Sequence, residues 1–286
     1  MTQPSIRLDR PETLGVLLNA TALVGFGWLC SLIDQRELFL ALQALLVLVP
    51  DPAWQALNLG GHFLGAASLF VVAVREGYGI GPLALMTFAA GAASASVKSL
   101  INAPRPAALI HDPGTLYTIG ETLTAKSMPS GHALTIAAVV GALCAMAAID
   151  RQREDSRHTL EHGWLLPVAG LITVGVALAR VASGAHWPAD VLVGAGLGLA
   201  IGFGCGILGV ALSERIQRFK EQAGLVLALE RATKALIALA LLLMPLPPSI
   251  SHEASLALGM VLAAMVLAGP LLAAQRCARD ERVRQR

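Results

Sequence analysis

Long apolar blocks that contain almost no charged residues run through most of this 286-residue chain. Hydrophobic residues make up 55% of the sequence and charged residues 14%, against roughly 25% charged residues in ordinary soluble domains. A water-soluble fold could not hide that much apolar surface behind so few charges. The sequence therefore predicts an all-α polytopic membrane protein, a bundle of membrane-spanning helices.

A helix needs about 20 mainly apolar residues to cross the ~30 Å hydrocarbon core of a bilayer. Candidate spans lie near residues 13–33, 57–75, 80–100, 129–149, 164–182, 190–211, 228–246 and 253–274. The shorter apolar run 37–50 ends at Pro50-Asp51-Pro52, and we expect an interfacial helix there. The expected architecture is thus a bundle of about eight spans.

The net charge of the chain is only +2, and its basic residues are scattered along the sequence. A nucleic-acid-binding protein carries a basic patch or stripe, so we expect no nucleic-acid partner. The cysteines show neither CxxC nor paired spacing, which predicts neither a disulfide framework nor a zinc site. They are Cys30, Cys144, Cys205 and Cys277.

The distribution of Lys and Arg predicts an orientation, because short cytoplasmic loops collect positive residues. With the N-terminus inside, 16 of the 21 Lys and Arg residues fall on the cytoplasmic side, and both termini lie there. The other five lie at or beyond the outer face and are Arg36, Lys98, Arg105, Lys126 and Arg180. Three of these five outer cations belong to one group of motifs.

Three short motifs stand at the outer ends of predicted spans. The first is KSLINAPRP, with Lys98 at the end of the third span and Arg105 in the loop after it. The second is PSGH, residues 129–132, at the start of the fourth span. The third is ARVASGAHWPAD, with Arg180 ending the fifth span and Asp190 opening the sixth. Because successive spans alternate in direction, all three motifs meet on one surface.

The cations Lys98, Arg105 and Arg180 in one place predict a polyanionic ligand. Guanidinium groups bind phosphate oxygens in a bidentate way, and a Lys ammonium acts as a point charge. At PSGH, the free backbone N–H groups of a helix N-terminus favour an anion. Ser130 adds a hydroxyl donor, and Gly131 lets a phosphate approach the backbone closely.

Two histidines beside these cations supply the groups that phosphoryl transfer needs. A neutral imidazole at His186 can attack phosphorus, and Asp190 can fix its tautomer and stabilise positive charge on the ring. His132, as an imidazolium, can protonate the departing alkoxide. The cations would hold the phosphoryl oxygens as charge redistributes in the transition state.

The stretches K-x6-RP, PSGH and R-x5-H-x3-D together resemble the three-part signature of the phosphatidic acid phosphatase type 2 superfamily, which also includes the vanadium haloperoxidases. The resemblance covers about residues 57–211. It implies a metal-independent phosphatase without a cofactor that forms a phosphohistidine at His186 and uses His132 as the general acid. The phosphate ligands that it implies are Lys98, Arg105, Ser130, Gly131 and Arg180.

The resemblance also divides the chain and shows one departure. Residues 1–56 would form an N-terminal span and an interfacial helix, 57–211 a phosphatase core, and 212–286 two further spans and a basic cytoplasmic tail. The family usually has Ser before the Arg of the third motif, whereas this chain has Ala179 there. One supporting hydrogen bond is therefore expected to be missing.

The leading hypothesis is an integral-membrane phosphatase that hydrolyses a lipid phosphate or diphosphate ester at the outer face. The family suggests a bacterial inner membrane with the site facing the periplasm, and undecaprenyl diphosphate, phosphatidylglycerophosphate or phosphatidic acid as substrate. Two alternatives stay open. One is a phosphotransferase that passes the phosphoryl group to another lipid such as lipid A, and the other is a non-catalytic phospholipid transporter. The sequence leaves the oligomeric state undetermined.

Two further patterns receive structural interpretations. His62, His158, His162 and His252 are interpreted as interfacial polar residues. Gly194, Gly198, Gly202 and Gly206 recur every four residues along the sixth span, a pattern that allows helices to approach closely. Packing within the chain is favoured over a dimer interface.

Overall fold

The computed structural model describes residues 10–112, 114–120, 122–152, 158–218, 220–243, 260 and 263–264. Throughout these ranges the secondary structure is helical, and no strand forms beyond an isolated β-bridge between Val74 and Leu160. Five helices of the described chain are long and apolar enough to cross a membrane. They are α1 (Arg10–Ser31), α5 (Ile80–Ile101), α7 (Gly131–Arg151), α8 (Leu165–Ala182) and α9 (Pro188–Gln217). The predicted all-α membrane helix bundle is confirmed.

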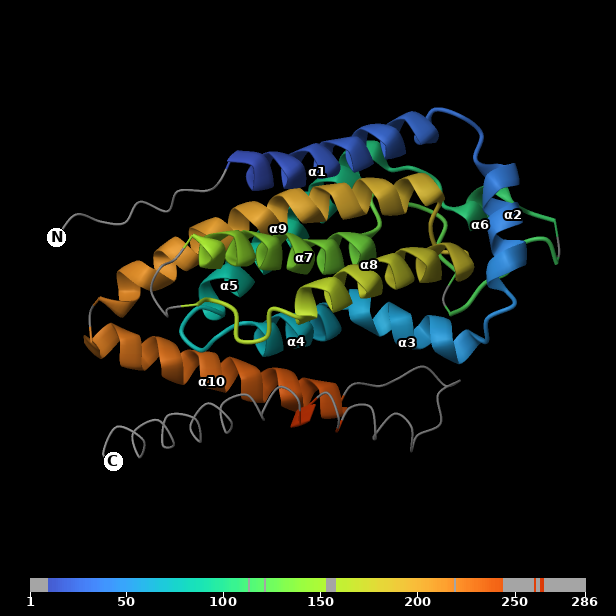
Figure 1. The fold of residues 1–286 in the computed structure, drawn as a ribbon. Helices are drawn as coiled ribbons and strands as arrows, with labels where there is room; N and C mark the ends of the chain where they lie inside the picture. The colour runs from blue at the N-terminus through green and yellow to red at the C-terminus, as the bar shows by residue number, and fades with distance from the viewer. Residues whose placement is uncertain are drawn as a thin grey trace.

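The structure divides the predicted span over 57–75 into two helices. α3 (Asp51–Gly61) and α4 (Phe63–Ala73) follow one another beside α8 and are separated by a break at His62 (Figure 1). α2 (Arg36–Leu46), at the predicted interfacial helix, is bent by 115° relative to α3. Counting this bent pair as one span gives up to six spans in the described residues.

The interface between α7 and α9 forms the centre of the bundle and depends on glycine. A Cβ placed on Gly198 would lie 2.2 Å from the Leu134 carbonyl oxygen, and one on Gly202 would lie 1.8 Å from that of Ala138. The backbones of the two helices therefore touch in a way that only glycine permits. The prediction that this glycine stripe packs within the chain is confirmed.

One end of the bundle gathers all the segments that carry the motifs. There α5 and α8 end, α7 and α9 begin, and α2 and α6 (Pro106–Leu109) lie close by (Figure 1). We call this the site end. α1 begins at the opposite end of the bundle, so the described N-terminus and the motifs are separated by the length of the spans.

The last described helix, α10 (Lys220–Leu243), packs against α4, α5 and α9 and covers most of the predicted span 228–246. Three charged residues near the middle of this helix form ion pairs. Lys234 lies 3.6 Å from Glu230 and 4.0 Å from Glu76, and Arg231 pairs with Glu76 at 3.1 Å. The predicted span 253–274 lies outside the described residues, apart from 260, 263 and 264.

Candidate active site

The turn after α8 places His186 at the site end. Gly184 has a φ of +71°, the left-handed conformation that glycine adopts without strain. The Gly184 N–H donates to the Val181 carbonyl at 3.0 Å, and the Ala185 N–H donates to the Arg180 carbonyl at 3.2 Å. These two bonds make a Schellman motif, the usual glycine-dependent end of a helix. This turn covers residues 180–185, and His186 is the next residue of the chain. The turn therefore sets the spacing between Arg180 and His186.

The first turn of α9 fixes Asp190 beside His186. Pro188 is the first residue of the helix, where its missing N–H loses no intrahelical bond. The Asp190 carboxylate accepts the Trp187 backbone N–H at 2.9 Å and also the Ser127 hydroxyl. Its Oδ2 atom lies 3.5 Å from His186 Nδ1. The carboxylate is thus held by two donors while it faces the imidazole.

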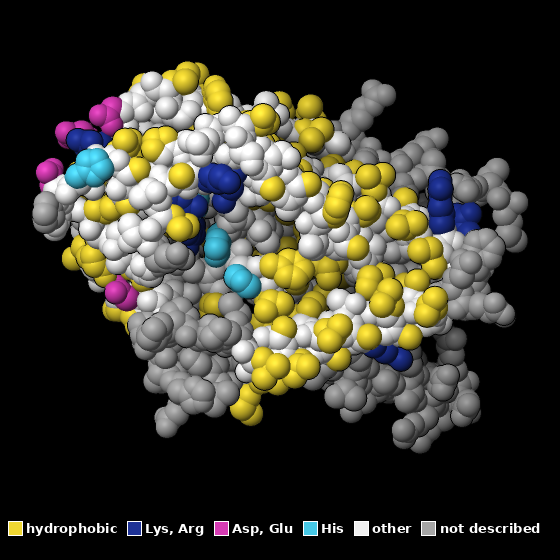
Figure 2. All heavy atoms as spheres, turned by 180° about the vertical axis from the view of Figure 1, so that it is seen from behind, with side chains coloured by type: hydrophobic (Ala, Val, Ile, Leu, Met, Phe, Trp, Pro, Cys, Tyr) yellow, Lys and Arg dark blue, Asp and Glu magenta, His cyan; other side chains and the backbone are white. Residues whose placement is uncertain are grey.

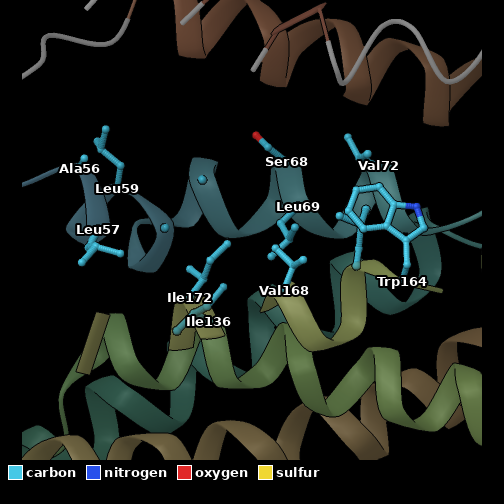
Figure 3. A pocket seen from close by; sticks show the side chains of 13 residues that line it. Ala56, Leu57, Leu59, Ser68, Leu69, Val72, Ile136, Trp164, Val168 and Ile172 are labelled. Carbon is cyan, nitrogen blue, oxygen red and sulfur yellow. The ribbon is translucent and has the colours of Figure 1, made fainter. Parts of the chain in front are cut away.

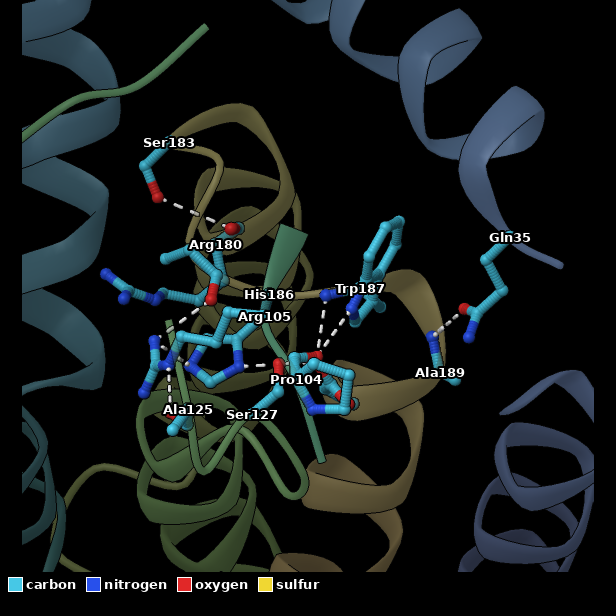
Figure 4. Close-up of polar contacts among 12 residues, drawn as sticks. Gln35, Pro104, Arg105, Ala125, Ser127, Arg180, Ser183, His186, Trp187 and Ala189 are labelled. Carbon is cyan, nitrogen blue, oxygen red and sulfur yellow. Dashed lines mark hydrogen bonds and ion pairs between the residues drawn. The ribbon is translucent and has the colours of Figure 1, made fainter. Parts of the chain in front are cut away.

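His186 is buried between this carboxylate and a guanidinium group (Figure 4). Its side chain is 2% exposed, and its Nε2 atom lies 3.4 Å from Arg105 Nη1. Burial lowers the pKa of His186 to about 4, a shift that Asp190 opposes and that Arg180 and Arg105 reinforce. The imidazole is therefore neutral at pH 7, which is the form that can act as a nucleophile.

Arg105 joins two loops beside the His186 ring. Its Nε atom donates to the Ala125 carbonyl and its Nη1 atom to the Ala185 carbonyl, both at 2.9 Å (Figure 4). The residue is only 5% exposed. A buried charge needs such partners to offset its desolvation. The same contacts hold the planar guanidinium in one orientation next to His186 Nε2.

The PSGH segment is connected to the third motif through the backbone. The Ser130 N–H donates to the Asp190 carbonyl at 2.9 Å, which joins the start of α7 to the start of α9. The Ser130 side chain is fully buried, and none of the described residues hydrogen-bonds to its hydroxyl. It therefore does not act as a side-chain cap of α7. A Cβ on Gly131 would lie 3.7 Å from Lys98 Nζ, so the ammonium group lies against this helix N-terminus.

Arg180 is positioned by a residue that sequence analysis missed. Its Nη1 atom donates to Asn58 Oδ1 on α3 at 3.2 Å. Its Nε atom is buried and has no hydrogen-bond partner within the described part of the chain. Buried polar groups are almost always paired. The Arg180 N–H and the Ser130 hydroxyl are therefore donors that a bound anion can satisfy.

His132 lies beside the break between α3 and α4. The ring centroids of His132 and His62 are 6.4 Å apart. A Cβ on Gly61 would lie 2.8 Å from His132 Cβ and 2.6 Å from Val176 Cγ1, so glycine is required for this approach. His62, which the sequence suggested as an interfacial residue, thus also lies near the predicted general acid. His132 is also within electrostatic range of His186.

The departure at Ala179 has a local explanation. Ala179 is fully buried and packs in an apolar cluster with Trp54 and Ala182. A serine hydroxyl directed into this cluster would need a partner to offset its burial.

The structure brings the eight predicted site residues together at the site end. They are Lys98, Arg105, Ser130, Gly131, His132, Arg180, His186 and Asp190. On the face shown in Figure 2, histidine and basic side chains lie together at a hollow, and hydrophobic side chains cover the middle of the molecule. A neutral imidazole paired with a carboxylate, next to several cations and free donors, can attack a bound phosphoryl group.

Three other members of the site were missed, namely Asn58, His62 and Ser127. Asn58 and His62 stand alone in an apolar stretch, and a single polar residue there has no recognisable pattern. Ser127 lies two residues before the PSGH motif, and this closeness to a motif was the signal in the sequence that could have identified it.

Comparison with known proteins gives a family match over the part of the chain that carries the motifs. Residues 79–220 match the model of the PAP2 superfamily. Among solved structures, LpxE from Aquifex aeolicus is 24% identical with a TM-score of 0.43, over 61% of this chain and 93% of that chain. A transmembrane PAP2-type phosphatidylglycerolphosphate phosphatase from Bacillus subtilis is 20% identical with a TM-score of 0.44, over 72% of this chain and 98% of that chain. No protein of curated function matches this sequence.

Proposed function

Because this chain belongs to the PAP2 superfamily, we propose that it is an integral-membrane lipid phosphatase that hydrolyses a phosphate or diphosphate ester of a lipid. The observation that carries the proposal is the buried His186 ring between Asp190 and Arg105. A site that only binds phosphate needs cations, but it has no use for an imidazole whose Nδ1 atom faces a carboxylate.

In the proposed first step, His186 Nε2 attacks phosphorus while the ester P–O bond breaks. The electron pair of that bond leaves with the alkoxide, which takes a proton from His132. Asp190 stabilises the positive charge that develops on the His186 ring. In the second step His132 accepts a proton from water and the water oxygen attacks phosphorus of the phosphohistidine. The P–N bond breaks, its electron pair returns to His186 Nε2, and inorganic phosphate leaves.

The phosphoryl oxygens are held by the surrounding donors. Arg105 lies next to the attacking nitrogen, and the unpaired donors of Arg180 and Ser130 are available to the phosphate. Lys98 and the backbone at Gly131 complete the set at the N-terminus of α7. These groups offset the charge of the transition state without having to reorganise.

The site would face the periplasmic side of a bacterial inner membrane, with both termini cytoplasmic. The support is the excess of Lys and Arg on the other side of the predicted topology. A site at the end of a membrane bundle is open to lipid head groups. Undecaprenyl diphosphate, phosphatidylglycerophosphate and phosphatidic acid are therefore the substrates to test.

The test is phosphate release from these three lipids by the wild type and by His186→Ala. We expect the variant to lose at least about a thousandfold in turnover while it still binds phospholipid. His158→Ala, an exposed histidine at the opposite end, is the matched control and should keep full activity. EDTA should leave the wild-type rate unchanged, and right-side-out vesicles should release phosphate to the outside. Unchanged release by His186→Ala would refute the proposal.

A further inference from the structure

An apolar groove of about 360 Å³ lies between the α3–α4 segment and α8 (Figure 3). Ile136 of α7 lines the groove opposite α4, and Trp164 stands at the end away from Ala56 and Leu57 (Figure 3). Ser68 is the one residue with a side-chain hydroxyl in the lining, and that hydroxyl donates to the Leu64 carbonyl of its own helix at 2.6 Å. The groove therefore offers hydrocarbon contact and few free polar groups.

The groove begins where the phosphate site ends. Leu57 and Leu59 line it and flank Asn58, the partner of Arg180. Gly60, also in the lining, precedes Gly61, which packs against His132. Ile136 lies one helical turn beyond His132 on α7. A molecule whose phosphate lies at His132 would thus lie next to the end of the groove that Leu57 and Leu59 line.

The groove extends along two successive helices. Its lining residues on α4, from Gly65 to Val72, cover about 10 Å at the rise of 1.5 Å per helical residue, and those on α3, from Ala56 to Gly60, cover about 6 Å. Half the hydrocarbon core of a bilayer is about 15 Å thick. Together the two stretches are therefore comparable with the depth that one leaflet gives to a lipid chain.

We propose that this groove binds one hydrocarbon chain of the lipid substrate, so that the chain orients the phosphate toward His186. The inference rests on the proposed phosphatase function. A chain in the bilayer is already out of water, so the groove selects by shape and contact. Its volume of about 360 Å³ is small for two long chains side by side, which favours phosphates of single-chain lipids such as polyprenyl phosphates over two-chain phospholipids.

The test fills the groove without touching the phosphate site. Val168 lines the groove from α8, whereas Leu171, one turn further along the same helix, is 74% exposed and lies outside the lining. Val168→Trp should lower kcat/KM for a long polyprenyl phosphate by about tenfold or more, because the head group is no longer oriented. Leu171→Trp should leave that value unchanged. Hydrolysis of water-soluble phenyl phosphate should be the same in both variants.

Calorimetric titration with orthovanadate shows whether the phosphate site of each variant is intact. If Val168→Trp does not fold, Val72→Trp fills the same groove from α4 and replaces it in the test. Equal kcat/KM values for Val168→Trp and Leu171→Trp would overturn the inference. So would a lower unfolding temperature of Val168→Trp with no change in substrate preference, the result expected if the groove were filled by packing within the chain. Failure of the phosphatase proposal is distinguishable, since the wild type would then release no phosphate from any of the lipids, or His186→Ala would keep full activity.

Discussion

At the scale of single residues, the state of His186 depends on its surroundings more than on its own chemistry. The ring is buried, Asp190 lies at its Nδ1 atom and Arg105 at its Nε2 atom. This arrangement places the Nδ1 proton toward the carboxylate and leaves Nε2 as the basic nitrogen. The proposed nucleophile is therefore prepared before any substrate binds.

The lowered pKa of His186 gives a direct prediction. Because burial disfavours the imidazolium, the ring should stay neutral down to about pH 4 and become protonated below that value. NMR titration of the full chain in detergent, with the His186 signal identified by its loss in His186→Asn, should give a midpoint near 4. A midpoint near the ordinary value of about 6.5 would show that the ring is not buried as described.

At this scale the sequence predicted the residues that belong to spaced motifs and missed those that reach the site from elsewhere. The spacing of Arg180, His186 and Asp190 is visible in the sequence because a helix end and a helix start fix it locally. Asn58 and His62 join them only through the packing of α3 against α8 and α7. Such contacts depend on tertiary structure, which no local pattern reports.

At the scale of elements, the contact between α7 and α9 determines where the second and third motifs meet. The two helices touch backbone to backbone at four glycines of α9, from Gly194 to Gly206. At the first of these, a Cβ on Gly194 would lie 2.6 Å from the Ser130 carbonyl oxygen, so the contact continues into the PSGH segment. The glycine stripe is thus a condition for the site as well as for the bundle.

We therefore expect Gly202→Ala to destabilise the protein by about 1–3 kcal/mol, because its methyl group would force α7 and α9 apart. Phosphatase activity should fall with it. Gly204→Ala, on the same helix with no described atom within 4 Å of its Cβ, is the matched control and should unfold at or slightly above the wild-type temperature. Equal melting temperatures of the two variants in detergent would mean that the helices are not in close contact.

The path of the chain from α2 to α4 could not be predicted in detail from the sequence. The apolar run over 57–75 suggests one span, because hydropathy averages over a break at a single polar residue. In the structure Gly61 and His62 interrupt the helix where it passes His132. The break thus coincides with close packing against α7, and Gly60 and Gly65 on either side of it line the apolar groove.

At the scale of the whole molecule, the alternation of spans explains why three distant motifs form one site. Apolar blocks predict the spans, and the motifs stand at span ends, so their meeting on one surface could be derived from the sequence alone. The structure shows the motifs gathered at one end, opposite the start of α1 (Figure 1). The groove beside them runs along the bundle toward the other end.

The central claim is that a phosphoryl group passes through His186. The most direct measurement is covalent trapping: the full chain is mixed with a radiolabelled lipid phosphate, quenched in alkali and digested, and the labelled peptide is identified by mass spectrometry. We predict alkali-stable, acid-labile phosphate on the peptide that contains His186, and none in His186→Ala. Label that persists in His186→Ala, or wild-type turnover without any label on that peptide, would contradict the account.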